Sequence, residues 1–220
     1  MEGMLNDSYR HKGLRKKLVE ELRAMGISDP RVLSAINAVP RHHFLSSAFL
    51  EFAYENKAFQ IGAGQTISHP FTVATQTQLL RIEPGMKVLE IGTGSGFQTA
   101  VLCEMGAKVY SIERQKLLHD NSKMLLGKMG YKPHLVYGDG YKGIPAFAPF
   151  DRVIITCAVP VIPEELIVQL KPGGLLVMPY GEGEVQQMML IEELPDGTFK
   201  SELHGDFSFV PMLEKRNSVH

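Results

Sequence analysis

Residues 88–96 read Val-Leu-Glu-Ile-Gly-Thr-Gly-Ser-Gly, and this stretch decides the fold. It begins as an apolar strand that ends in an acidic side chain, and three glycines follow at alternate positions. Because glycine has no Cβ and tolerates positive φ, such a turn lets the backbone approach a nucleotide-sized ligand at the start of the next helix. The stretch therefore predicts a strand, a turn and a helix, with a ligand site at the turn.

The sequence around this turn alternates short apolar runs with amphipathic stretches, which is typical of parallel βαβ units. The pattern predicts strands at 87–91, 108–112, 133–137, 152–156 and 174–179, and helices at 97–105, 115–129 and 164–170. We therefore expect an α/β fold with a doubly wound, mostly parallel sheet.

The two flanks of this core have different patterns. Residues 12–25 have helical periodicity, and Asp29-Pro30 supplies an N-cap and a first-turn proline for a second helix that reaches Val39. After the core, residues 185–193 and 198–209 flank a Pro-Asp-Gly turn, which predicts an antiparallel hairpin at the sheet edge.

These patterns predict a single domain over residues 1–220. We expect an N-terminal helical extension with a substrate loop in 1–84, a cofactor-binding core in 85–180, and a C-terminal hairpin and tail in 181–220.

Composition narrows the class of protein. The 23 Lys and Arg residues balance 24 Asp and Glu residues, so the chain lacks the basic charge of a duplex-binding domain, and we expect no nucleic-acid partner. Cys103 and Cys157 form no Cys-x-x-Cys motif, and adjacent His42 and His43 lack the spacing of a shared ligand pair, so we expect no metal. No run approaches the roughly 20 apolar residues that span a bilayer. We expect a cytoplasmic protein without membrane segments or a stable partner.

Two further acidic residues follow predicted strands. Glu113 ends the second strand, where a carboxylate can accept both hydroxyls of a ribose, and Asp139 lies between Gly138 and Gly140 after the third, where it can meet an adenine amino group. Singly, Glu113 can instead pair with Arg114, and Asp139 can cap a turn. Together with the glycine turn they form an adenosine-binding row that resembles the AdoMet-dependent methyltransferases, whose sheet is seven-stranded.

Residues 64–70, Gly-Gln-Thr-Ile-Ser-His-Pro, precede the core. Pro70 can start a helix, which would place the Thr66 and Ser68 hydroxyls just upstream of a helix N-terminus that favours an anion. In a simpler interpretation, Ser68 caps the helix and Thr66 satisfies the backbone.

This segment resembles the G-Q-T-I-S-x-P signature of the protein-L-isoaspartate O-methyltransferases. Other segments of that family match in the same order over about residues 18–212: Val39-Pro40-Arg41 with Phe44, 88–96, Gly138-Asp139-Gly140, Phe150-Asp151, Ile162-Pro163, 169–174 and Phe209-Val210-Pro211. The resemblance implies methyl transfer from S-adenosyl-L-methionine to the free α-carboxylate of L-isoaspartyl residues in damaged proteins and peptides. S-adenosyl-L-homocysteine is the product, and the methyl ester starts a repair.

The resemblance also implies roles for individual residues. Ser68 would be the catalytic residue that hydrogen-bonds the carboxylate, and the substrate would also contact Thr66, Ile67 and Val210. The implied cofactor contacts are Gly92, Gly94 and Gly96 under the methionine moiety, Glu90 near its ammonium group, Glu113 at the ribose, and Asp139 and Gly140 at the adenine. His69 and Cys157 depart from the residues expected of the family at their positions.

Three alternatives remain open at this point. The first is a methyltransferase of the same fold that acts on a small molecule or RNA, although the Thr-Cys-Ala-Val-Pro of 156–160 disfavours methylation of base amino groups. The second is an NAD-dependent oxidoreductase, for which the expected G-x-G-x-x-G spacing is missing. The third is a binding module without catalytic activity.

Overall fold

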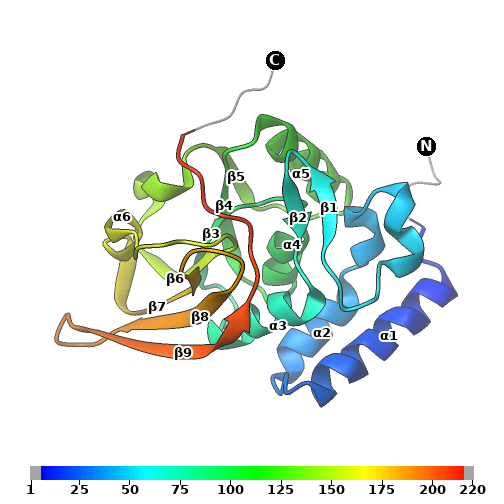
Figure 1. Cartoon of the computed structure of the whole chain (residues 1–220), viewed down its shortest axis with the longest axis horizontal. Helices are drawn as coiled ribbons and strands as arrows, with labels where there is room; N and C mark the ends of the chain where they lie inside the picture. Colours follow the sequence, from blue (N-terminus) through cyan, green and yellow to red (C-terminus); the bar gives the residue numbers. More distant parts are fainter. Residues whose placement is uncertain (1–5, 216–220) are drawn as a thin grey trace.

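A seven-stranded sheet forms the centre of the computed structural model, which describes residues 6–215. In spatial order its strands are β5 (His134–Tyr137), β4 (Lys108–Glu113), β3 (Lys87–Ile91), β6 (Phe150–Ile155), β7 (Leu170–Tyr180), β8 (Gln186–Glu193) and β9 (Phe199–Phe207). The first five are parallel, and β8 and β9 form an antiparallel hairpin (Figure 1). This confirms the predicted doubly wound, mostly parallel seven-stranded sheet with a C-terminal hairpin.

The six α-helices of residues 6–215 are α1 (Tyr9–Ala24), α2 (Pro30–Ala38), α3 (Pro70–Leu79), α4 (Phe97–Glu104), α5 (Lys116–Lys128) and α6 (Glu164–Ile167). The local sequence caps the first two of them, α1 and α2. Helix α1 starts before the predicted residue 12 because the Ser8 side chain accepts a hydrogen bond from the His11 N–H. Helix α2 begins as predicted: Asp29 accepts from the Arg31 N–H, and Pro30 occupies the first turn.

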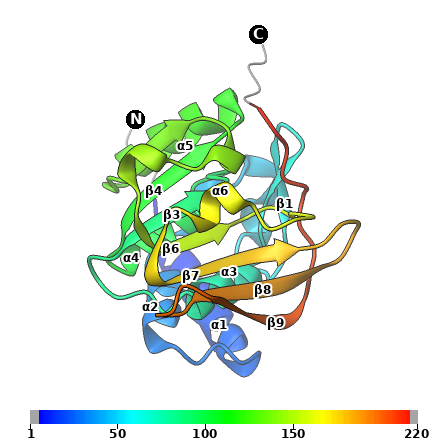
Figure 2. The same cartoon turned by 90° about the vertical axis from the view of Figure 1, so that its left-hand side faces the viewer.

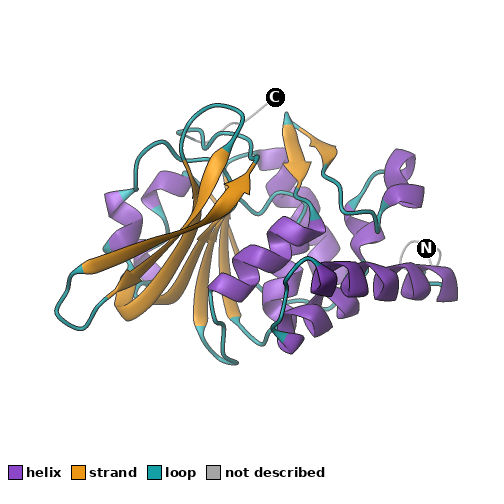
Figure 3. Cartoon of the chain, turned by 60° about the horizontal axis from the view of Figure 1, so that its bottom comes forward, coloured by secondary structure: helices purple, strands orange, loops and turns teal. Residues whose placement is uncertain are grey.

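Helices lie on both faces of the sheet (Figure 3), and each face buries its own apolar cluster. Neighbouring residues along a strand point to opposite faces, so Val88 belongs to the cluster that includes residues of α1 to α5, whereas Leu89 and Ile91 belong to the cluster that includes α6. Because both faces are covered, apolar residues stand next to one another in the central strands, as at Val88-Leu89 in β3 and 153–155 in β6. No helix in residues 6–215 has both the length and the apolar character needed to cross a membrane.

A small hairpin precedes α3, and the sequence did not predict it. Strand β1 (Phe59–Gly62) pairs with β2 (Gln65–Ile67) in an antiparallel register, and the turn between them has positive φ at three successive residues, 62–64. In two perpendicular views the chain after β9 runs beside this hairpin (Figures 1 and 2). The hairpin and the C-terminal segment thus come together at the carboxyl ends of the parallel strands.

Candidate active site

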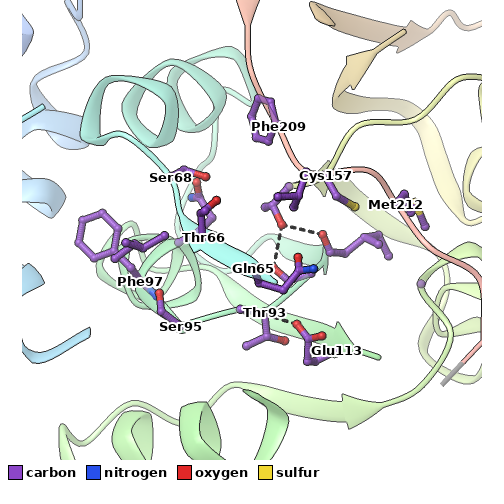
Figure 4. Close-up of a pocket in the computed structure, with 18 of the residues that line it drawn as sticks. Gln65, Thr66, Ser68, Thr93, Ser95, Phe97, Glu113, Cys157, Phe209 and Met212 are labelled. Atoms are coloured by element: carbon purple, nitrogen blue, oxygen red, sulfur yellow. Dashed lines mark hydrogen bonds between the residues drawn. The ribbon is translucent and has the colours of Figure 1, made fainter. Parts of the chain in front are cut away.

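A cavity opens where the strand order reverses, at the carboxyl ends of β3, β4 and β6. This is the position at which doubly wound sheets bind ligands. The wall includes five segments far apart in sequence: 65–69, 91–95, 112–114, 156–157 and 208–213. In the close-up, Thr66 and Ser68 lie together on one side and Glu113 on another (Figure 4). One hollow therefore joins the hydroxyl-bearing turn to the glycine turn.

The glycine turn has the backbone conformation that its sequence predicts. Gly92, Gly94 and Gly96 have φ values of 95°, 54° and 89°. A Cβ on Gly92 would lie 2.5 Å from the Thr156 hydroxyl oxygen. Gly92 and Gly94 line the cavity, whereas Gly96 starts α4 and packs against Leu126. The close approach of backbone to ligand is thus available at two of the three predicted glycines.

Glu113 lies at the cavity wall with 5% of its surface exposed. Its carboxylate oxygens accept hydrogen bonds from the Gly94 N–H at 2.9 Å and the Gln115 N–H at 2.8 Å. Burial raises the pKa of this carboxyl, and the backbone donors oppose the rise. The Arg114 guanidinium hydrogen-bonds the carbonyls of residues 214 and 215. Glu113 therefore supports the glycine turn and still offers acceptor lone pairs to the cavity.

Two other predicted cofactor residues do not reach the wall. Glu90 is fully buried beneath the glycine turn and accepts a hydrogen bond from the Thr99 hydroxyl at 2.5 Å, and burial raises its pKa to about 8. Asp139 accepts from the N–H groups of Tyr141 and Lys215, both at 3.1 Å, so it caps a turn. Its neighbour Gly140 does line the cavity, and a Cβ there would lie 2.6 Å from Ile91.

The predicted substrate residues all line the cavity. Thr66 and Ile67 come from β2, and Ser68 follows immediately. Ser68 is not the cap of α3, because that position belongs to His69, whose side chain makes no capping bond. Across the cavity, the carbonyl of Val210 accepts a hydrogen bond from the Ala158 N–H at 2.8 Å. This bond holds the closing segment over the end of β6.

Comparison with known proteins decides the family. The model of the family described as "Protein-L-isoaspartate(D-aspartate) O-methyltransferase (PCMT)" matches residues 13–217. The chain belongs to this family. A protein-L-isoaspartate O-methyltransferase from Flavobacterium psychrophilum is 53% identical over 214 residues, which cover 97% of this chain and all of the relative. Its counterpart from Cytophaga hutchinsonii is 52% identical over 211 residues, 96% of each chain.

Solved structures show the same similarity. A structure of a protein-L-isoaspartate O-methyltransferase superposes with a TM-score of 0.81 at 29% identity, over 90% of this chain and 65% of that one. A second, described as a putative enzyme of this family from Plasmodium falciparum in complex with S-adenosyl-L-homocysteine, has a TM-score of 0.78 at 22% identity and supports the fold alone.

The two departures from the family pattern both lie at the cavity. Burial and the nearby Arg41 charge lower the pKa of His69, which keeps its imidazole neutral. Burial raises the pKa of the Cys157 thiol to about 12, so it stays protonated and is a poor nucleophile. Neither residue is set up for acid–base or covalent chemistry at neutral pH.

Sequence reasoning missed several residues of the wall, among them Gln76 and Gln98. Gln76 is buried, and its Nε2 donates to the Ile155 carbonyl at 2.9 Å. Gln98 Nε2 donates to the Thr77 hydroxyl at 3.0 Å. The available signal was the polar character of α3 and α4 on faces that must pack against the sheet. Gln76 thus ties α3 to β6, and Gln98 ties α4 to α3.

Asp7, His11 and His42 bring possible metal ligands within 4.8 Å of one another, outside the cavity. Both oxygens of Asp7 accept hydrogen bonds from Arg15, at 3.0 and 2.9 Å, and His42 Nδ1 lies 2.6 Å from the Tyr54 hydroxyl. Burial lowers the pKa of His42 to about 4. We therefore interpret Asp7 and His42 as parts of a hydrogen-bonded network with Arg15 and Tyr54 that anchors the start of the described chain, and the His11 ring packs on His42.

Proposed function

We propose that the chain transfers the methyl group of S-adenosyl-L-methionine to the free α-carboxylate of L-isoaspartyl residues in damaged proteins and peptides. The observation that carries this proposal is the single cavity that joins the Ser68 turn to the glycine turn and Glu113. Relatives that are 52–53% identical over nearly the whole chain carry the same activity in their names.

The cofactor side of the cavity suits S-adenosyl-L-methionine, which when bound supplies a sulfonium methyl group. Gly92 and Gly140 leave space that any side chain would fill, since a Cβ on either would collide with the wall. The free lone pairs of Glu113 suit the ribose hydroxyls. Glu90 supports the glycine turn without reaching the cavity, because its hydrogen bond from Thr99 joins β3 to α4 under the turn.

The substrate side needs to orient a carboxylate rather than to deprotonate it. A carboxyl group of pKa near ~4 is already ionised at neutral pH, so the protein needs no general base. The Ser68 hydroxyl donates to one carboxylate oxygen at the N-terminal end of α3, whose dipole favours negative charge. Phe97 and Phe209 also line the cavity and exclude water around the reacting oxygen. Orientation and loss of water then provide the rate enhancement.

The chemistry of the product explains how such a reaction repairs protein. Methylation turns the carboxylate into an ester, which the neighbouring backbone amide nitrogen attacks, and methanol leaves. Hydrolysis of the resulting succinimide returns a share of normal aspartyl linkages. The substrates are therefore isoaspartyl proteins and peptides. The two free cysteines, Cys103 and Cys157, support a reducing compartment, the cytoplasm.

The test is transfer of labelled methyl from S-adenosyl-L-methionine to two peptides that differ only in an aspartyl or isoaspartyl linkage. We expect label in the isoaspartyl peptide alone. Ser68→Ala should lower kcat by about 10- to 100-fold, the effect of one hydrogen bond to a charged group, and leave cofactor affinity nearly unchanged. Ser201→Ala, at an exposed position of β9, is the matched control. Equal labelling of both peptides would refute the substrate assignment.

A further inference from the structure

Helix α3 is tied to its surroundings along most of its length. Three side-chain hydrogen bonds hold its middle and its end: Gln76 Nε2 to the Ile155 carbonyl (2.9 Å), Gln98 Nε2 to the Thr77 hydroxyl (3.0 Å), and the Ser28 N–H to Gln78 Oε1 (2.8 Å). The first two partners belong to the cavity wall or to the elements that form it. The body of α3 is thus fixed relative to β6 and α4 without any contribution from its first turn.

The first turn of α3 depends on a residue from another segment. His69 makes no side-chain cap, and Pro70 has no N–H, so the first backbone donor of the helix is Phe71. Its N–H donates to Asn56 Oδ1 at 2.9 Å. Asn56 therefore supplies the cap that the local sequence lacks. The capped residue, Phe71, lies three residues after Ser68.

Asn56 is itself held in place by a buried arginine. Arg41 is 1% exposed, and it donates from Nε to the Ala53 carbonyl at 3.0 Å and from Nη2 to the Lys57 carbonyl at 2.8 Å. These two bonds bracket Asn56 in sequence. The guanidinium carbon of Arg41 also lies 5.1 Å from the ring centroid of Phe97, the first residue of α4 after the glycine turn. Arg41 thus connects the loop that carries Asn56 to Phe97 in the cavity wall.

We propose that Asn56 is a positioning residue: its side-chain oxygen fixes the first turn of α3 and so places the Ser68 hydroxyl opposite the glycine turn. This inference rests on the function proposed above. Asn56 does not line the cavity, so it acts through the turn of residues 68–70 rather than on the substrate. Because methyl transfer depends on alignment, a small displacement of this turn reduces the rate strongly.

The other contacts of α3 separate this role from a general effect on stability. The Phe71 ring stacks on Phe207 with centroids 6.1 Å apart, and the three hydrogen bonds farther along α3 do not involve Asn56. Without Asn56, the helix therefore stays in place while the backbone of its first turn loosens. Gln78, in contrast, holds the C-terminal end of α3: its side-chain oxygen accepts hydrogen bonds from the loop before α2.

The test compares Asn56→Ala, Asn56→Asp and the control Gln78→Ala in the full chain, with an isoaspartyl peptide as substrate. We expect Asn56→Ala to lower kcat about five- to tenfold, the effect of one lost cap on the position of the turn. Asn56→Asp keeps the acceptor oxygen and should return kcat to within about twofold. Gln78→Ala should lower the Tm with kcat unchanged. Cofactor Kd, measured by calorimetry, should stay constant in all three.

Amide hydrogen exchange gives a second readout that is independent of turnover. In Asn56→Ala the Phe71 amide should exchange at least about tenfold faster, while the amides of the second half of α3 keep their protection. Equal kcat in Asn56→Ala and the parent, or equal losses in Asn56→Ala and Gln78→Ala, would overturn the proposal. Failure of the proposed function would instead appear in the parent chain as absence of isoaspartate-dependent transfer. In that case unchanged exchange at Phe71 would still refute the capping role.

Discussion

The substitution Gly92→Ala tests whether the glycine turn is shaped by its contact with β6. Gly92 has φ of 95°, a region that costs an L-residue about 1–2 kcal/mol. The new Cβ would also lie 2.5 Å from the Thr156 hydroxyl, which has to move away. That hydroxyl donates toward the carbonyls of Ile91 at 2.9 Å and Gly92 at 2.8 Å, and loss of its hydrogen bond costs about 1 kcal/mol. Gly92→Ala should thus destabilise the protein by about 2–3 kcal/mol.

A double-mutant cycle with Thr156→Ala separates the two contributions. Thr156→Ala alone should cost about 1 kcal/mol for the same hydrogen bond. The double variant loses this bond once and has no collision, so it should cost about as much as Gly92→Ala alone, with a coupling of about 1 kcal/mol. Gly94→Ala is the control, because its Cβ would meet only Ile61, at 3.6 Å. Urea unfolding of the four variants measures these differences, and strict additivity of the two substitutions would refute the steric argument.

Three further predictions concern titratable groups of the structure. Glu113→Ala should weaken S-adenosyl-L-methionine binding about 10- to 100-fold in calorimetry, because it removes a charged acceptor and leaves the Gly94 N–H unpaired; an unchanged Kd would exclude its ribose role. Burial raises the pKa of Glu90 to about 8, so the folded state holds this proton and its stability falls as pH rises from about 4.5 to 8, by at most about 1.4 kcal/mol per pH unit. Glu90→Gln should flatten that part of the unfolding profile, and a profile equal to the parent's would show that Glu90 is ionised. Burial lowers the pKa of His42 to about 4, so stability is lost as pH falls from about 6.5 to 4, and His42→Gln should reduce this loss in acid unfolding.

Regular elements were predictable because their periodicity and caps are local. The strand at 87–91 and the first-turn proline of α2 agree with the structure residue by residue, and α1 differed in its start because Ser8 provides a cap before the apolar pattern begins. The β1–β2 hairpin was missed for a physical reason. Its strands have four and three residues, and the burial of β1 only alternates between partial and exposed, so their pairing leaves little hydrophobic signal in the sequence.

The position of Glu90 shows what a motif cannot supply. Glu90 is the fourth residue of β3, and strand alternation places it on the same face as Val88, which is covered by α4. Its side chain therefore lies under the helix rather than in the cavity. The motif indicates an acid near the turn. The alternation of the strand and the helix packed on it determine whether that acid faces the cavity or is buried under the turn.

The assembly of the cavity also explains why the substrate signature lies outside the nucleotide-binding core. The glycine turn, Glu113 and Thr156 lie together at the carboxyl ends of the parallel strands. The alternating strands and helices of the core do not cover these ends. The antiparallel β8–β9 hairpin returns the chain to the same ends, where residues 208–213 cross them, and the β1–β2 hairpin brings residues 65–69 to the cavity as well. A reaction that depends on excluding water needs both walls. We therefore expect substrate selection to depend on residues of the two flanks, and α3 joins the first of them to the core.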